Sequence, residues 1–362
     1  MKETIGSVTI PEFITESGVR MKDLVQVYSA YGERRDSNVV LVCHALTGSH
    51  RLAGKTLTGQ PDPWWDTLVG EGKALDTNKY FIVCFNNLAS PYGSTSPLSL
   101  NPETGKPWGM GFPILSPRDV ARAQKLALEK LGISKIDTVV GGSLGGMIAC
   151  EIALSYPDDV QKCAMVAAPD KLYPQAIAFN AVQRQSITSD PDWRNGNYEK
   201  GAGPVKGLAA ARMLAMITYR SEQSFSGRYM REMASGSATD WSGQFQVESY
   251  LHHHGEELVR RFDANCYLYL TRMMDLHDVG AGRGGIPAAW SRFAGKKLLA
   301  VGISSDMLFA NWQVEEAARV ASENGVTSKY DEIESDNGHD AFLIDFDQLD
   351  EMMRGFLHVR DC

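Results

Sequence analysis

The sequence Gly141-Gly142-Ser143-Leu144-Gly145 lies between two segments of different character. Residues 136–140, which precede it, form an apolar run typical of a buried strand, and residues 147–154, which follow it, have the composition of a buried helix. Glycine at the flanking positions allows a sharp turn on which Ser143 projects its Oγ atom from the carboxyl end of a sheet. This context predicts a nucleophile elbow, with a structural or phosphate-binding turn as the alternative.

The composition is that of an ordinary globular protein. Hydrophobic residues make up 43% and charged residues 22% of the 362 residues, a length that accommodates one large α/β domain with an insertion or two smaller domains. The 36 Lys and Arg residues against 44 Asp and Glu residues give a formal net charge of −8. Because there is also no basic stripe, we expect no nucleic-acid partner.

The six cysteines are scattered and show none of the paired spacing of a disulfide framework or a zinc site. We therefore expect free thiols in a reducing compartment and no bound metal. Residues 1–18 contain no apolar run of a signal peptide, and no stretch approaches the ~18 apolar residues of a membrane span. These features predict a cytoplasmic enzyme without a membrane segment.

Strand-like and helix-like segments alternate along much of the chain. Residues 23–31 alternate as in an antiparallel strand, and further strands are predicted at 38–43, 80–85, 136–140, 161–167, 297–303 and 329–333. Helices are predicted at 116–131, 147–154 and 312–324, with a final helix from about residue 341. The repeating pattern predicts an α/β fold whose mostly parallel sheet is flanked by helices on both faces.

Residues 169–295 break this pattern, because they show mostly helical periodicity with many polar and aromatic residues and no buried-strand run. We predict a helical lid at 170–285, inserted into a catalytic domain formed by residues 1–169 and 286–362. The Gly-, Pro-, Ser- and Asn-rich stretch 86–117 is long for a loop and is therefore expected to be functional.

A serine nucleophile needs a general base, and the base needs a third group that holds its tautomer. In enzymes with a nucleophile elbow, the chain order is Ser, then Asp or Glu, then His. Asp306 follows the strand predicted at 297–303, and His339 lies in a Gly-containing turn after the strand predicted at 329–333. We therefore select Ser143, Asp306 and His339 as a candidate catalytic triad, with Asp331 and Asp336 as competitors for the acid.

The chain contains eight histidines, and the others are given more ordinary roles. Three consecutive histidines at 252–254 diverge around a helix and cannot converge on one metal ion. His277, in the predicted lid, is kept as a residue that could touch the site. The remaining histidines are interpreted as structural or surface residues: His44, His50 and His358.

Residues 43–48, Cys-His-Ala-Leu-Thr-Gly, follow an early predicted strand. In enzymes of this type, one oxyanion N–H group comes from such a loop and the other from the residue after the nucleophile. Leu46 and Leu144 are therefore the candidate donors, and the N-terminus of the helix after Ser143 supports the same charge. The alternative for residues 43–48 is a plain turn at the end of a strand.

Taken together, these segments resemble the homoserine O-acyltransferases of the α/β-hydrolase superfamily over almost the whole chain. The matching pieces are CHALTGSH (43–50), PWWDTLVGEGKALDTNKYFIVCFNNL (63–88), YGSTSPLSLNPETGKPWG (92–109), GGSLGGM (141–147), RQSITSDPDW (184–193), GLAAARMLAMITY (207–219), RFDANCYLYLT (261–271) and NGHDAFL (337–343). The resemblance implies an α/β-hydrolase fold with a helical lid and a ping-pong reaction, in which Ser143 takes an acyl group from acyl-CoA and passes it to an amino-acid hydroxyl.

The resemblance also implies roles for residues beyond the triad. Arg212 would bind the substrate carboxylate with help from Tyr219, and Asp340 would bind the ammonium group. A zwitterionic amino acid needs one cation and one anion, each fixed relative to the reacting hydroxyl. As alternatives, Arg212 could form a salt bridge on a lid helix and Asp340 could cap the final helix. No bound cofactor is implied, and a homodimer paired through the lid helices is expected.

The expected reaction converts acetyl-CoA and L-homoserine into O-acetyl-L-homoserine and CoA, a step of methionine biosynthesis. Departures from the family pattern in residues 86–91 and at Ser96 keep succinyl-CoA open as donor, and serine or another alcohol as acceptor. A plain esterase is the alternative from another reaction class, and a non-catalytic protein on the same fold is a third. Arg212 and Asp340 favour the transferase, because an esterase needs no matched cation and anion beside its triad.

Overall fold

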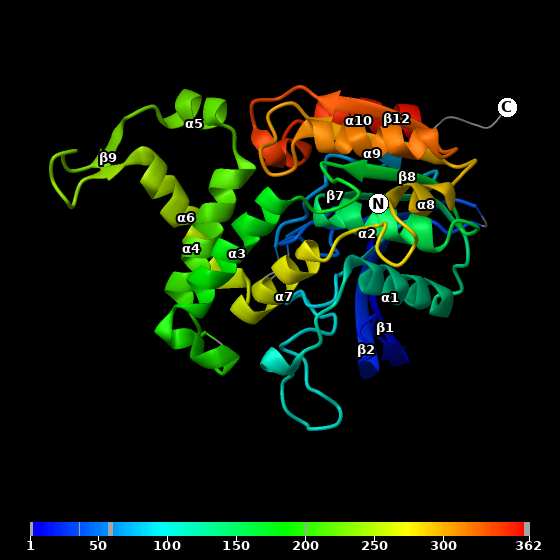
Figure 1. The fold of residues 1–362 in the computed structure, drawn as a ribbon, viewed down its shortest axis with the longest axis horizontal. Coiled ribbons are helices and arrows are strands. Elements are labelled where there is room, and N and C mark those ends of the chain that lie inside the picture. Colours follow the sequence, from blue (N-terminus) through cyan, green and yellow to red (C-terminus); the bar gives the residue numbers. More distant parts are fainter. Residues whose placement is uncertain (1–2, 36, 57–60, 200, 358–362) are drawn as a thin grey trace.

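A single eight-stranded sheet forms the centre of the computed structural model, which describes residues 3–35, 37–56, 61–199 and 201–357 (Figure 1). The strand order is β1-β2-β6-β3-β7-β8-β11-β12, with antiparallel pairing of β1 with β2 and of β2 with β6, and parallel pairing elsewhere. The strands are β1 (Glu3–Ile14), β2 (Arg20–Tyr31), β3 (Val39–Cys43), β6 (Phe81–Phe85), β7 (Ile136–Gly142), β8 (Val160–Val166), β11 (Lys297–Ile303) and β12 (Thr327–Ile333). The predicted α/β class is therefore confirmed.

Both faces of the sheet are buried, which explains the continuous apolar runs of the central strands. Along β3, Leu41 faces one core while Val40 and Val42 face the other. The first core lies under α1 (Pro117–Lys130), α2 (Leu144–Ser155) and α8 (Ile286–Ser291), and the second lies under α10 (Phe346–Leu357). A further helix, α9 (Asn311–Glu323), packs on β11 and β12.

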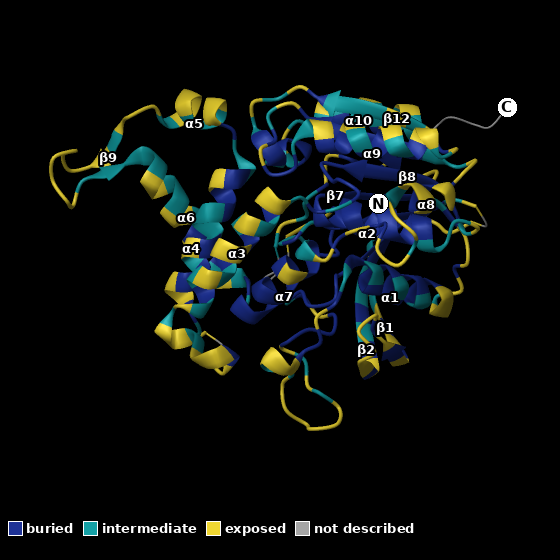
Figure 2. Ribbon diagram, in the orientation of Figure 1, coloured by how far each residue is buried: buried dark blue, intermediate teal, exposed yellow. Residues whose placement is uncertain are grey.

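Between β8 and β11 the described part of the chain is mostly helical and adds no strand to the eight-stranded sheet. We refer to residues 170–285 as the helical segment. In Figure 1, α5, β9 and α6 project away from the sheet, and Figure 2 shows α5 and β9 as largely exposed and α6 as mostly intermediate, while α2 is buried. The elements are α3 (Pro174–Thr188), η2 (Pro191–Gly196), α4 (Val205–Tyr219), α5 (Glu222–Tyr229), β9 (Met233–Ser235), β10 (Gln244–Phe245), α6 (Gln246–Arg261) and α7 (Ala264–Asp275). Three shorter elements precede α1: β4 (Val69–Gly70), β5 (Leu75–Asp76) and η1 (Gly109–Gly111).

The predicted element boundaries are met closely where local signals are strong. Helix α1 begins after Ser116, whose hydroxyl accepts the N–H of Asp119 while the Asp119 carboxylate accepts the N–H of Ser116. The short elements β4, β5, β9, β10 and α8 were not predicted, and two longer elements also differ from the prediction. Strand β1 was not predicted, and the final helix α10 starts at Phe346 rather than near residue 341, because a 3₁₀ turn, η3 (Gly338–Leu343), comes first and the extended φ of −131° at Ile344 interrupts the helix.

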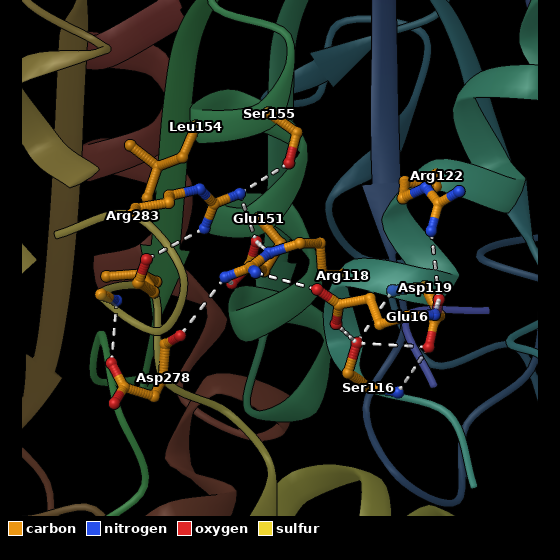
Figure 3. Close-up of polar contacts among 12 residues, drawn as sticks. Glu16, Ser116, Arg118, Asp119, Arg122, Glu151, Leu154, Ser155, Asp278 and Arg283 are labelled. Carbon is orange, nitrogen blue, oxygen red and sulfur yellow. Dashed lines mark hydrogen bonds and ion pairs between the residues drawn. The ribbon is translucent and has the colours of Figure 1, made fainter. Parts of the chain in front are cut away.

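Helix α2 is fixed at its C-terminal half by a buried ion cluster, which Figure 3 shows. Glu151 accepts hydrogen bonds from Arg118 Nε at 2.9 Å and from Arg283 Nη2 at 2.8 Å. Arg118 also pairs with Glu16 at 2.9 Å, and Arg283 also donates to Ser155 Oγ at 2.7 Å. The cluster therefore joins the β1–β2 hairpin, α1, α2 and the end of the helical segment.

Of the cysteines, the five at described positions are free and buried, whereas Cys362, like His358, lies outside the described residues. Across the described ranges of the chain, no helix combines the length and apolar character needed to cross a membrane.

Candidate active site

The turn around Ser143 has the geometry of a nucleophile elbow. Strand β7 ends at Gly142 and α2 begins at Leu144, so Ser143 alone makes the turn, with φ 56° and ψ −126°. This is a left-handed conformation that a residue with a side chain adopts only at a cost. The backbone also approaches closely here, since a Cβ atom on Gly145 would collide with the carbonyl oxygen of Cys43. Glycine at 145 is therefore required by the contact between α2 and β3.

The three residues predicted to form a triad lie within hydrogen-bonding distance of one another. The Ser143 hydroxyl lies 2.9 Å from His339 Nε2, and His339 Nδ1 lies 2.6 Å from Asp306 Oδ2. The other carboxylate oxygen of Asp306 accepts the N–H groups of Leu308 and Phe309 at 2.8 and 2.9 Å. With Nδ1–H donating to Asp306, Nε2 is free to accept the Ser143 proton.

The electrostatics around His339 favour its protonated form. Burial, the largest effect, lowers its pKa, but the charge and hydrogen bond of Asp306, together with the charge of Asp340, outweigh burial and hold the pKa of His339 above the ordinary 6.5. A histidine with a raised pKa is a stronger base toward a serine hydroxyl. The loop that carries it is held by close backbone packing, because Gly338, with φ +68°, lies against the backbone of residues 219–221.

Leu46 lies in a tight turn beside Ser143. The turn is closed by the Gly48 N–H donating to the Ala45 carbonyl at 3.1 Å, and it makes no use of the Leu46 N–H. His44 supports the turn: burial lowers the pKa of His44 to about 4, so its neutral ring donates from Nδ1 to the Ala45 carbonyl at 2.7 Å. The Leu144 N–H is the first of α2 and has no partner within the helix. Both N–H groups are therefore available to an oxyanion.

A cavity of about 190 Å³ opens over the triad. It is lined by Ala45, Leu46, Thr47, Gly48, Trp64, Ser143, Arg212, Tyr219, Arg261, His339, Asp340, Phe342 and Leu343. The sheet domain supplies the triad and the turn at 45–48, while the helical segment supplies Arg212, Tyr219 and Arg261. Side chains from both parts of the chain thus surround one small space.

The three residues assigned to the amino-acid substrate by resemblance all line this cavity. The Arg212 guanidinium lies 5.5 Å from the centre of the Tyr219 ring, and that ring lies 5.6 Å from the ring of His339. Burial raises the pKa of Tyr219 to about 12, so its hydroxyl remains a donor at neutral pH. Asp340 is half-buried beside His339, with Arg220 Nη2 at 3.7 Å. Burial raises the pKa of Asp340, against the opposing charges of Arg220 and Arg212.

Arg220, Trp64 and Arg261 were not assigned a role from the sequence. Arg261 begins the motif piece 261–271, which is the signal that could have drawn attention to it. Its contacts could not be foreseen, since Arg261 Nη1 donates to the Thr47 carbonyl at 2.9 Å and to the Tyr92 hydroxyl at 2.6 Å, across 214 and 169 residues of sequence.

The competing candidates lie elsewhere. Asp331 pairs with Lys329 at 2.5 Å, and the backbone carbonyl of Asp336 accepts the hydroxyl of Ser221. His277 is buried with its Nε2 3.0 Å from the carbonyl of Pro169, and His50 lies 2.9 Å from the Ser29 hydroxyl. None of these side chains lines the cavity over Ser143. In the part of the chain that the structure describes, no group of three or more His, Cys, Asp or Glu side chains is arranged to hold a metal ion.

Comparison with known proteins gives a consistent picture. A family model described as the alpha/beta hydrolase fold matches residues 38–346. The homoserine O-acetyltransferase of Moorella thermoacetica is 46% identical over 346 residues, which cover 94% of this chain and 92% of that protein. Among solved structures, homoserine O-acetyltransferase from Bacillus anthracis is similar with a TM-score of 0.93 at 28% identity, covering 99% of both chains. Esterase E22 is similar with a TM-score of 0.90 at 28% identity, covering 99% of this chain and 100% of its own.

Proposed function

The chain belongs to the homoserine O-acetyltransferase family of the α/β-hydrolase fold and is an O-acyltransferase, and we propose that it transfers the acetyl group of acetyl-CoA to the hydroxyl of L-homoserine. The products are O-acetyl-L-homoserine and CoA. This reaction would supply methionine biosynthesis in the cytoplasm.

One observation carries the choice of an amino-acid acceptor. The cavity over Ser143 presents a guanidinium, Arg212, and a carboxylate, Asp340, in addition to the hydrogen-bonded triad. An α-amino acid carries the complementary carboxylate and ammonium groups, and an Arg fork can bind a carboxylate with two parallel hydrogen bonds. The cavity of about 190 Å³ is also small, which favours a short acceptor and a two-carbon acyl group.

In the acylation half-reaction, Ser143 Oγ attacks the thioester carbonyl while His339 Nε2 takes the hydroxyl proton. The carbonyl oxygen becomes an oxyanion that accepts hydrogen bonds from the N–H groups of Leu46 and Leu144. When the tetrahedral intermediate collapses, the C–S bond breaks and the thiolate of CoA takes the proton from His339. Asp306 stabilises the imidazolium through the Nδ1 hydrogen bond, and Ser143 is left as an acetyl ester.

The second half-reaction reverses these steps with the amino-acid hydroxyl in place of Ser143. His339 takes the proton of the acceptor hydroxyl, whose oxygen attacks the acetyl carbon of the acyl-enzyme. Collapse breaks the bond to Ser143 Oγ, which regains a proton from His339. Arg212 and Asp340 hold the acceptor by its carboxylate and ammonium, so that its hydroxyl meets the acyl carbon.

The helical segment has a role in this scheme, because it supplies Arg212 and Tyr219 and covers the cavity as a lid. We also propose that two copies pair through this segment. Its projecting arm contains the fully exposed Trp241 and the largely exposed Met230, and an apolar surface of this kind favours association.

A plain esterase is the second candidate, since esterase E22 shares this fold with a TM-score of 0.90 at 28% identity. The deciding experiment measures free-thiol release from acetyl-CoA and from succinyl-CoA, each with L-homoserine, with L-serine and without an acceptor. We expect thiol release that depends on acetyl-CoA and homoserine. Thiol release that no acceptor accelerates, or none at all alongside hydrolysis of simple esters, would replace the transferase with the esterase.

A further inference from the structure

Arg261 is a cation of the cavity to which the proposed mechanism gives no task. It is the last residue of α6, and its side chain enters the cavity that contains Ser143. One nitrogen, Nη1, donates both of its bonds to the protein, to the Thr47 carbonyl at 2.9 Å and to the Tyr92 hydroxyl at 2.6 Å. Through this one nitrogen the guanidinium links two protein oxygens, and it is suited to hold them in place.

The atom that Arg261 holds belongs to the proposed oxyanion turn. Thr47 is the third residue of the turn Ala45–Leu46–Thr47–Gly48, which lines the same cavity as Ser143 and contains the proposed Leu46 donor. The other supports of this turn are local, namely the Gly48 N–H and the His44 ring on the Ala45 carbonyl. Arg261 therefore adds a hydrogen bond at the other end of the turn, on the peptide between Thr47 and Gly48. This bond comes from the helical segment.

Tyr92 completes the arrangement. Its ring packs edge-on against Phe262, the neighbour of Arg261, with ring centres 5.8 Å apart, and its side chain is buried. Burial raises the pKa of the Tyr92 hydroxyl, so it stays protonated and accepts the Arg261 hydrogen bond through a lone pair. Arg261 is thus fixed between a buried tyrosine and the oxyanion turn.

We propose that Arg261 is a positioning residue. By binding the Thr47 carbonyl, it holds the Leu46 N–H where it can donate to the oxyanion formed at Ser143. The helical segment then does more than bind the acceptor, because it completes the oxyanion hole. This inference rests on the proposed nucleophile and oxyanion turn, and it is independent of which acyl-CoA and which alcohol are the substrates.

The test uses p-nitrophenyl acetate, whose reaction with Ser143 needs the oxyanion hole but neither CoA nor an amino acid. We expect Arg261→Met to lower the acylation rate constant about 10- to 100-fold with little change in the ester's KM. This is less than the roughly 10²–10³-fold cost of removing an oxyanion donor, because the Leu46 N–H is displaced and not lost. Arg261→Lys should recover part of the rate, because an ammonium can still donate to Thr47. Tyr92→Phe, which keeps the Thr47 bond, should lower the rate by less than about 3-fold.

The matched control is Arg260→Met, which removes the adjacent arginine of α6, whose side chain is 66% exposed and pairs with Glu256 and Glu257. All variants are compared at equal folded fraction, monitored by thermal unfolding. An Arg261→Met rate equal to that of Arg260→Met would overturn the proposal, as would a loss confined to the KM of the amino-acid acceptor. A wild-type enzyme that p-nitrophenyl acetate does not acylate at Ser143 would overturn the nucleophile and this inference together. Normal acylation without thiol release from acyl-CoA would overturn the proposed substrates alone.

Discussion

The two ends of helix α2 carry charged clusters that differ in how completely they are paired. At the C-terminal half, Glu151 is 2% exposed and takes hydrogen bonds from Arg118 and Arg283, which are paired further with Glu16 and Ser155 (Figure 3). At the N-terminal end, Asp340 pairs with Arg220 at 3.7 Å, but no carboxylate among the described residues forms an ion pair with Arg212, which lines the cavity over Ser143. The first cluster is closed and the second is open.

The difference has a physical cause. A buried charge is costly unless hydrogen bonds and opposite charges satisfy it, so a closed cluster is a structural device that tolerates little change. In an open cluster at least one charge, here that of Arg212, has no ion pair with a carboxylate of the described residues, and the carboxylate of a ligand can then complete it. Pairing therefore separates the residues that hold α2 in place from those proposed to bind the substrate near its N-terminus.

Substituting the serine at each end of α2 gives the largest expected contrast. Ser143→Ala should lower acyl transfer by about 10⁴-fold or more, because no other group provides the nucleophile. Ser155→Ala removes only a hydrogen bond to Arg283 and should keep full activity at a cost of about 1 kcal/mol in stability. Thiol release from acetyl-CoA and urea unfolding measure the two effects. Turnover by Ser143→Ala above a trace would contradict the role of the elbow.

Breaking the closed cluster should reduce stability and leave the chemistry intact. Glu151→Gln leaves two arginines without their buried anion, which should lower the free energy of unfolding by about 3–5 kcal/mol. The control is Glu316→Gln, which breaks an exposed ion pair with Arg319 and should cost less than about 1 kcal/mol. Activity per folded molecule should remain that of the wild type. Loss of activity without loss of stability would show that the cluster acts on the site.

The features that could be predicted from the sequence are those with local causes. The elbow at Ser143 follows from glycine spacing between an apolar strand and helix, and α1 from the capping residues Ser116 and Asp119. Asp306 and His339 could be selected because both follow strands of a parallel sheet, whose carboxyl ends meet at one edge. Their hydrogen bonds to each other and to Ser143 are geometric consequences of that topology.

The features that could not be predicted depend on contacts between distant segments. Arg261 binds a backbone carbonyl 214 residues away. Every residue has a backbone carbonyl, so the residue type at 47 gives no sign of this contact. The pairing of Glu151 with Arg283 likewise joins residues 132 positions apart. Strand β1 was missed because many of its side chains are exposed at the edge of the sheet, so its hydrophobic signal is weak.

Removing the unpaired cation of the open cluster should affect one half-reaction only. Arg212→Ala should lower kcat/KM for homoserine about 100-fold, since hydrogen bonds to charged groups contribute about 1.5–3 kcal/mol each. The burst of CoA from acetyl-CoA without acceptor should stay within about 3-fold of the wild type. Arg212→Lys, which retains the charge without the planar fork, should fall between the two. Equal loss in both half-reactions would contradict the assignment of Arg212 to the acceptor.

The smallest expected effect is on the pKa of His339, to which the charge of Asp340 contributes. As the proposed general base, His339 would act in its neutral form, so ester hydrolysis should rise with pH through its pKa, which lies above 6.5. Asp340 contributes to that raised pKa, and Asp340→Asn should therefore move the rising limb to lower pH. The substrate is p-nitrophenyl acetate, which has no ammonium for Asp340 to bind. Asp331→Asn, at a carboxylate paired with Lys329, should leave the profile unchanged. An unshifted limb in Asp340→Asn would show that the charges facing the cavity act on the acceptor alone and not on the base.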